Sequence, residues 1–125
     1  MTAYIKTVEL SFVVLRFHEG FVVARIKNGV VLDHEKLDEL LRTVQKFFNG
    51  KKHVYISERI NDYNVDPLIY PQLVQEKTLS GIAIICKTAA AVKGANFEKK
   101  FSKVPFEVFM EFEDAREWAL ELLKK

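Results

Sequence analysis

Residues 81–86 read Gly-Ile-Ala-Ile-Ile-Cys, and every position after the glycine is apolar. A half-buried strand alternates apolar and polar side chains, whereas this run is apolar on both parities. Such a run is typical of a central parallel strand that is covered on both faces. The stretch therefore predicts a buried strand at the middle of a sheet, and the flanking sequence shows what surrounds it.

Toward the N-terminus, the sequence predicts extended structure. Residues 7–17 read as one strand, because Val8, Leu10, Phe12 and Val14 share one parity while Glu9 and Ser11 take the other. Glu19-Gly20 is a turn, and residues 21–27 form a second strand, so the two strands are expected to pair as a hairpin. Residues 30–32 are expected to extend the sheet.

Residues 33–50 contain the clearest helix pattern. Asp33 is a good N-cap, since its carboxylate can accept hydrogen bonds from free backbone N–H groups. Gly50 suits the left-handed C-cap position. The apolar residues at helical spacing are Leu37, Leu40, Leu41, Val44, Phe47 and Phe48. Residues 53–57 then predict a short strand.

The C-terminal half continues the alternation. Asp66-Pro67 starts a short, irregular helix over residues 68–77, because Pro71 lacks the N–H that a regular helix needs. Thr88 caps a helix that runs to about residue 101. Residues 106–112 predict a strand and residues 114–125 a final helix.

The predicted order is β-β-α-β-α-β-α-β-α. Strands that alternate with helices indicate an α/β domain with a mostly parallel sheet, crossover helices and an antiparallel edge hairpin. The chain has 125 residues and no repeat or linker, which predicts one domain over residues 1–125.

Composition excludes several classes of function. The net charge is +2, and basic and acidic residues are interleaved, so nucleic acid is not expected as a partner. Cys86 is the only cysteine, which excludes an intramolecular disulfide and a cysteine-rich zinc site. There is neither a signal-peptide core nor a membrane-length apolar run, so we expect a cytoplasmic protein with no integral membrane segment.

Two segments resemble a known family. Residues 105–109 (PFEVF), followed by residues 112–120 (FEDAREWAL), look like the closing strand and helix of SpoIIAA-like proteins. Residues 53–57 with Glu58-Arg59 resemble the third strand of that group and the polar loop beyond it. The order of elements also resembles the STAS domain of SpoIIAA-type anti-sigma factor antagonists. The resemblance implies a STAS (SpoIIAA-like) fold and a regulatory, non-enzymatic role.

One feature departs from the family pattern. The resemblance implies a phosphorylatable serine at the start of the helix after the third strand. Residues 58–77 contain no serine or threonine. A phosphorylation switch at that place is therefore not supported, which puts the anti-sigma role in doubt.

The polar loop at residues 58–66 is the best candidate for a binding site. It holds three acids, two asparagines and a tyrosine. It follows the carboxyl end of a parallel strand, where open α/β sheets tend to bind ligands. A solvated turn with capping side chains is the alternative. The candidate partner-binding residues, which include the following helix and the start of the helix at Thr88, are Glu58, Arg59, Asn61, Asp62, Tyr63, Asn64, Asp66, Tyr70, Lys87 and Thr88.

No catalytic, metal or cofactor site is predicted. The three histidines (His18, His34 and His53) are scattered, whereas zinc needs converging ligands. Cys86 has no histidine partner at a recognisable spacing, and the chain contains no phosphate-binding glycine motif.

The leading hypothesis is a regulatory or scaffolding module that binds a partner protein, with Tyr63 and Tyr70 as anchors. The alternative is a small apolar ligand or lipid, held in a cavity behind residues 89–95. An enzyme that uses Cys86 or the acidic loop is a third, weaker hypothesis. Pairing of the edge hairpin with a second copy would make a homodimer.

Overall fold

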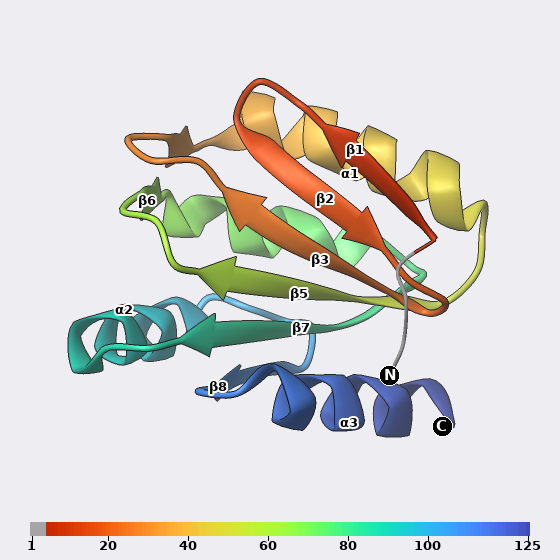
Figure 1. The fold of residues 1–125 in the computed structure, drawn as a ribbon. Coiled ribbons are helices and arrows are strands. Elements are labelled where there is room, and N and C mark those ends of the chain that lie inside the picture. Colours follow the sequence, from red (N-terminus) through yellow and green to blue (C-terminus); the bar gives the residue numbers. More distant parts are fainter. Residues whose placement is uncertain (1–4) are drawn as a thin grey trace.

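The computed structural model describes residues 5–125. A six-stranded sheet has the order β1-β2-β3-β5-β7-β8 (Figure 1). Its strands are β1 (Lys6–Glu9), β2 (Val13–Phe17), β3 (Phe21–Ile26), β5 (His53–Arg59), β7 (Leu79–Cys86) and β8 (Phe106–Phe109). β3, β5, β7 and β8 pair in parallel, while β1, β2 and β3 pair antiparallel. The mostly parallel sheet with an antiparallel edge is therefore confirmed.

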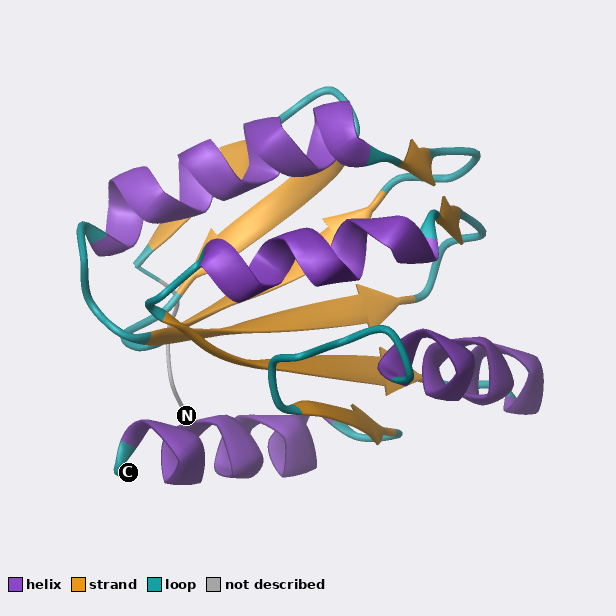
Figure 2. Ribbon diagram, turned by 180° about the vertical axis from the view of Figure 1, so that it is seen from behind, coloured by secondary structure: helices purple, strands orange, loops and turns teal. Residues whose placement is uncertain are grey.

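Helices cover both faces of this sheet. They are α1 (His34–Phe48), the 3₁₀ helix η1 (Pro67–Gln75), α2 (Ala89–Lys99) and α3 (Phe112–Leu123). The larger hydrophobic core contains buried residues of α1, η1 and α2, and the smaller one contains Ala115 and Ala119 of α3. Figure 2 shows α1 and η1 lying across one face, with α3 on the other side of the sheet.

β7 occupies the buried position that its sequence predicts. Residues 81–86 are all buried, and even residues face the larger core while odd residues face the smaller one. Gly81 allows α3 to lie close to the strand, since an added Cβ would lie 2.5 Å from Leu122 Cδ1. The doubly apolar pattern therefore reflects two separate cores, one on each face.

The prediction of a single strand over residues 7–17 was wrong. β1 ends at Glu9 and β2 begins at Val13, and the turn between them is closed by a hydrogen bond from Leu10 N to Val13 O at 2.8 Å. Phe12 lies in this turn and is buried, and so is Val13. The turn therefore shifts the alternation, and Val13 rather than Val14 faces the core.

Residues 31–32 also differ from the prediction. They form β4 (Val31–Leu32), which pairs with β6 (Asn64–Val65) in a separate two-stranded parallel sheet. The region expected to be an extension of the main sheet thus holds part of the polar loop in place. β5 continues to Arg59, two residues beyond the predicted strand end.

The helix ends agree with the capping chemistry in most places. Asp33, Asp66 and Thr88 accept hydrogen bonds from the backbone N–H groups of Lys36, Leu68 and Ala91. α1 ends at Phe48, and the C-cap Asn49 (φ 48°) and the following Gly50 (φ 87°) both have positive φ. The helix expected over residues 68–77 is a 3₁₀ helix, because Pro71 cannot donate to a regular helical ladder.

Candidate functional site

An open cleft of about 490 Å³ lies between residues 60–67 and α2. Figure 1 shows β5 and β7 pointing toward the end of the molecule where β6 and α2 lie. The cleft is therefore at the carboxyl ends of two central parallel strands, where open α/β sheets bind ligands. Its lining comprises Arg59, Ile60, Asn61, Asp62, Tyr63, Asn64, Val65, Pro67, Thr88, Ala90, Ala91, Gly94, Phe97 and Glu98.

The loop that forms one wall is tied to the turn after β3. The Asn61 side chain donates to Ile26 O at 2.9 Å, and Asn28 Oδ1 accepts from Asp62 N at 2.8 Å. The carbonyl of Asp62 accepts from Gly29 N, also at 2.8 Å. These long-range bonds, together with the β4–β6 pairing, hold the loop in one shape. It is thus a formed wall and not a loose turn.

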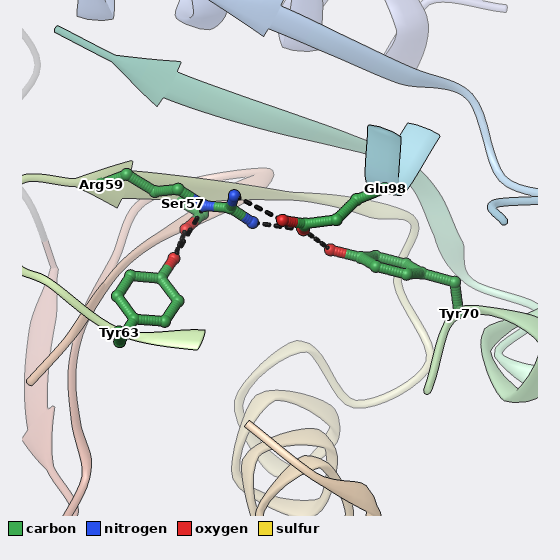
Figure 3. A network of polar contacts seen from close by, with 5 residues as sticks. All are labelled: Ser57, Arg59, Tyr63, Tyr70 and Glu98. Carbon is green, nitrogen blue, oxygen red and sulfur yellow. Dashed lines mark hydrogen bonds and ion pairs between the residues drawn. The ribbon is translucent and has the colours of Figure 1, made fainter. Parts of the chain in front are cut away.

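A polar network forms the floor of the cleft (Figure 3). Arg59 Nη1 donates to Glu98 Oε2 at 2.6 Å, and Nη2 donates to Oε1 of the same carboxylate. Glu98 Oε1 also accepts from the Tyr70 hydroxyl. Arg59 Nε donates to the Tyr63 hydroxyl at 3.0 Å, and that hydroxyl lies 3.1 Å from Ser57 Oγ.

Both charged members of the network are nearly enclosed. The Arg59 and Glu98 side chains are 12% and 10% exposed. Burial is the largest single influence and would lower the pKa of Arg59, but the hydrogen bond to Glu98, together with the charge interactions with Tyr63, Glu98 and Tyr70, outweighs it and the pKa is raised. Burial, followed by the nearby Glu98 charge, raises the pKa of Tyr70 well above its usual value. The network is therefore a charged pair with a neutral tyrosine at either end.

The structure brings six of the ten candidate residues together. Arg59, Asn61, Asp62, Tyr63, Asn64 and Thr88 all line the cleft.

Glu58, Lys87 and Asp66 are used elsewhere in the molecule. Glu58 projects from the opposite face of the sheet and pairs with Arg25 at 3.1 Å. Lys87 donates to Met110 O and pairs with Glu111. Asp66 caps η1 by accepting from Leu68 N at 3.0 Å, as the alternative of capping side chains predicts.

Tyr70 needs a correction. The sequence suggested it as a surface anchor, but it is 5% exposed and its hydroxyl points inward to Glu98. A partner cannot reach it in this conformation. Tyr70 is buried because it lies, with Ile69 and Leu73, on the side of η1 that packs against the sheet.

Among the lining residues that the sequence did not mark as candidates, three contribute most to the character of the cleft. Glu98 is buried at the floor, and Ile60 and Phe97 line the cleft with 54% and 53% of their surfaces exposed. Glu98 is the only acidic residue between residues 87 and 103, a stretch that holds five lysines. That isolated charge was the one signal that could have marked it.

The segment 89–95, behind which a ligand cavity was expected, borders the open cleft, since Ala90, Ala91 and Gly94 are among the residues that line it. Ala95 is fully buried against the larger core. A cavity of about 40 Å³ lies instead under α1 and η1, lined mainly by apolar side chains. This volume has room for roughly three water molecules and not for a lipid chain. The small-ligand hypothesis stays a prediction that would need this cavity to widen.

A metal ion and a cysteine nucleophile are the other candidate chemistries within residues 5–125. No group of three or more histidine, cysteine, aspartate or glutamate residues there could hold a metal ion. Cys86 is buried, and burial raises the pKa of its thiol above the usual value. Within the same residues, no helix has the length and apolar character needed to span a membrane.

Comparison with known proteins identifies the fold. No protein-family model matches the chain, and no curated protein matches its sequence. A solved structure from Shewanella loihica PV-4, described as an uncharacterised protein of the DUF3478 family with a SpoIIAA-like fold, superposes with a TM-score of 0.57. The match covers 95% of this chain and 98% of that one at 14% identity. The chain has a SpoIIAA-like α/β fold, as its sequence predicted.

Proposed function

We propose that the protein is a non-enzymatic binding module that holds a segment of a partner protein in the cleft between residues 60–67 and α2. The observation that carries this proposal is the cleft itself, which combines a fixed wall with exposed apolar side chains. Ile60 and Phe97 are large, apolar and more than half exposed at its edge. Apolar anchors of this kind contribute most of the energy in protein interfaces.

The polar floor favours a protein segment over a small molecule. Small ligands are oriented by a few well-placed polar groups in their pocket. Here Arg59 and Glu98 bind each other, and Tyr63 and Tyr70 bond to that pair. Few donors or acceptors of the floor remain to orient a small ligand, so binding would come from the contact area of the walls. The cleft is also open to solvent between its two walls, which suits an extended or helical segment.

Affinity capture from the source cells, followed by binding measurements with the purified partner, tests the proposal. The test variant is Ile60→Asp, which places a charge at the edge of the cleft. Val74→Asp is the matched control, because Val74 is 56% exposed, close to the 54% of Ile60, and lies outside the cleft. Asp62→Lys is a second test, whereas Asp66 is avoided because it caps η1.

We expect the wild type and Val74→Asp to bind the same partner with equal affinity. Ile60→Asp should weaken binding by roughly tenfold or more, the usual effect of losing an apolar anchor. Thermal unfolding of each variant controls for folding. Equal partner affinity in all three proteins would disprove the assignment of this cleft.

A further inference from the structure

A second concave surface lies beside the cleft, on the adjoining side of α2. We call it the outer α2 groove; it has a volume of about 700 Å³ and is lined by Thr88, Ala89, Val92, Lys93, Asn96, Phe97, Lys100 and Met110. Phe97 and Thr88 border both the groove and the cleft. Phe97 and Met110 are 53% and 57% exposed. The groove is thus a largely apolar surface of α2 and Met110 that lies open among the described residues.

The charge around α2 is unusual for this nearly neutral chain. Residues 87–103 contain five lysines and one glutamate, and that glutamate, Glu98, is already paired with Arg59. Two of the lysines are neutralised from outside the helix, Lys87 by Glu111 and Lys99 by Glu107.

Lys93 and Lys100 have no such partner. No ion pair within residues 5–125 involves either of them. Lys100 Nζ lies 6.0 Å from the centre of the Phe97 ring, and this cation–π contact keeps the Lys100 ammonium beside the apolar residues of the groove. The groove therefore carries two uncompensated positive charges.

Helical spacing puts these charges on one side of α2. Lys93 and Lys100 are seven residues apart, so they project from the same side about 10 Å apart along the axis. Ala89, Val92 and Asn96 follow the same stripe, and Phe97 lies between the two lysines. A bound segment would contact the apolar residues of the groove and would have Lys93 near one end and Lys100 near the other.

We infer that the outer α2 groove binds an acidic segment of the partner protein. Apolar side chains of the segment would pack against the apolar residues of the groove, and its carboxylates would pair with Lys93 and Lys100. This inference rests on the proposed function in one respect, that the partner is a protein. It adds the chemistry of the partner. The argument is charge complementarity over an apolar groove, which determines partner choice in protein interfaces.

An acidic segment fits better than a nucleic acid or an anionic membrane. Proteins that follow a phosphate backbone neutralise many phosphates with clustered basic side chains. Here two lysines line the groove, and Glu107 and Glu111 are close by as the partners of Lys99 and Lys87. Those carboxylates would repel an extended polyanion. A short segment with two well-placed acids avoids them.

Selection from a displayed library of random peptides, each about 16 residues or 24 Å long as a helix, tests the inference. The baits are the wild type, the groove variant Lys93→Glu/Lys100→Glu, and the control Lys51→Glu/Lys52→Glu. The control makes the same charge change at two exposed lysines at the other end of β5. Peptides enriched on the wild type are then synthesised, and their affinities are measured by fluorescence anisotropy at low and high salt.

We expect the wild type and the control to enrich peptides that combine acidic with apolar residues. Reversal of both lysines should weaken the best peptide by roughly tenfold or more, and added salt should weaken its binding to the wild type. The inference fails if enriched peptides are not acidic or bind the groove variant equally well. It also fails if the wild type selects no acidic peptide but binds oligo-dT or phosphatidylserine vesicles through these lysines.

Ile60→Asp separates this inference from the proposed function. Ile60 lines the cleft and does not line the groove. Loss of partner binding in Ile60→Asp, with the groove variant unaffected, would support the cleft and contradict the acidic-segment inference. Loss in the groove variant, with Ile60→Asp unaffected, would support the groove and contradict the cleft.

Discussion

At the scale of single residues, the Arg59–Glu98 pair dominates the site. It joins β5 to α2 across 39 positions of sequence and draws in Tyr70 from η1. α2 buries only Ala95 and Glu98. The pair therefore adds a charged contact to the apolar packing of Ala91, Val92 and Ala95 on the larger core. Arg59 also donates to the Tyr63 hydroxyl in the other wall of the cleft, so the pair is in contact with both walls.

Removing one member of this pair should destabilise the protein strongly. Arg59→Met leaves the Glu98 carboxylate buried with Tyr70 as its remaining partner, and Glu98→Gln leaves the Arg59 charge uncompensated. Loss of one partner of a buried pair costs about 3–5 kcal/mol, whereas the double variant removes both charges and should cost less than the sum. Urea unfolding of the two single variants and the double variant measures the coupling.

The exposed pair between Lys124 and Glu121 serves as the control. Its side chains are 72% and 70% exposed, so Lys124→Met should leave the free energy of unfolding unchanged within error. If Arg59→Met costs no more than this control, the pair does not hold α2. Additive single and double variants would likewise show that the two residues do not act together.

At the scale of elements, the sequence predicted most strands and helices but not all of their boundaries. Residues 81–86 and the α1 stripe were unambiguous, because burial on two faces and helical periodicity each leave a clear pattern. The turn between β1 and β2 left none, since residues 10–12 are Leu-Ser-Phe and contain no glycine, proline or asparagine. The turn depends on Phe12 packing into the core, and this is a tertiary contact that the local sequence does not show.

The candidate site was predictable in position and not in detail. The loop after β5 was expected at the carboxyl end of a parallel strand, and five of its predicted residues line the cleft together with Thr88. The predicted strand ended at residue 57 and so did not include Glu58 and Arg59, which face opposite sides of the sheet and have separate partners. The contact between Arg59 and Glu98 depends on how α2 packs, and no local pattern encodes that. Tyr70 failed as an anchor for the same reason.

Two glycines give opposite predictions for the same substitution. Gly94 lies within α2, and a Cβ added there would meet nothing within 4 Å. Gly94→Ala should therefore stabilise the protein by about 0.5–1 kcal/mol, because alanine favours the helix and restricts the unfolded chain.

Gly81→Ala should destabilise the protein instead. An added Cβ would lie 2.5 Å from Leu122 Cδ1 and 3.0 Å from Trp118 Cη2, so these two side chains of α3 must give way. The expected loss is about 1–3 kcal/mol, the usual cost of overpacking. Thermal or urea unfolding of Gly94→Ala and Gly81→Ala measures both changes in the free energy of unfolding. Equal effects of the two substitutions would contradict the close approach of α3 to β7.

At the scale of the whole molecule, the fold depends on two cores that share one sheet. Phe21, Val54, Ile56 and Ile85 project toward α3, and each is at most 3% exposed. The sites proposed above belong to the other end and the other face, where α2 and residues 60–67 lie. α3 should thus matter for folding and not for direct contact with a partner.

Truncation after Met110 tests this division, because it removes α3 and uncovers the whole smaller core. Each uncovered large side chain forfeits about 1.5–3 kcal/mol of burial, and several such losses exceed the usual stability of a domain. We expect the truncated chain to lose its cooperative urea transition, whereas removal of only Lys124 and Lys125 should not change the midpoint. A truncated chain that still unfolds cooperatively would show that the larger core alone maintains the sheet. In that case α3 would be a cover that a partner could displace, and the face beneath it would become a second candidate for binding.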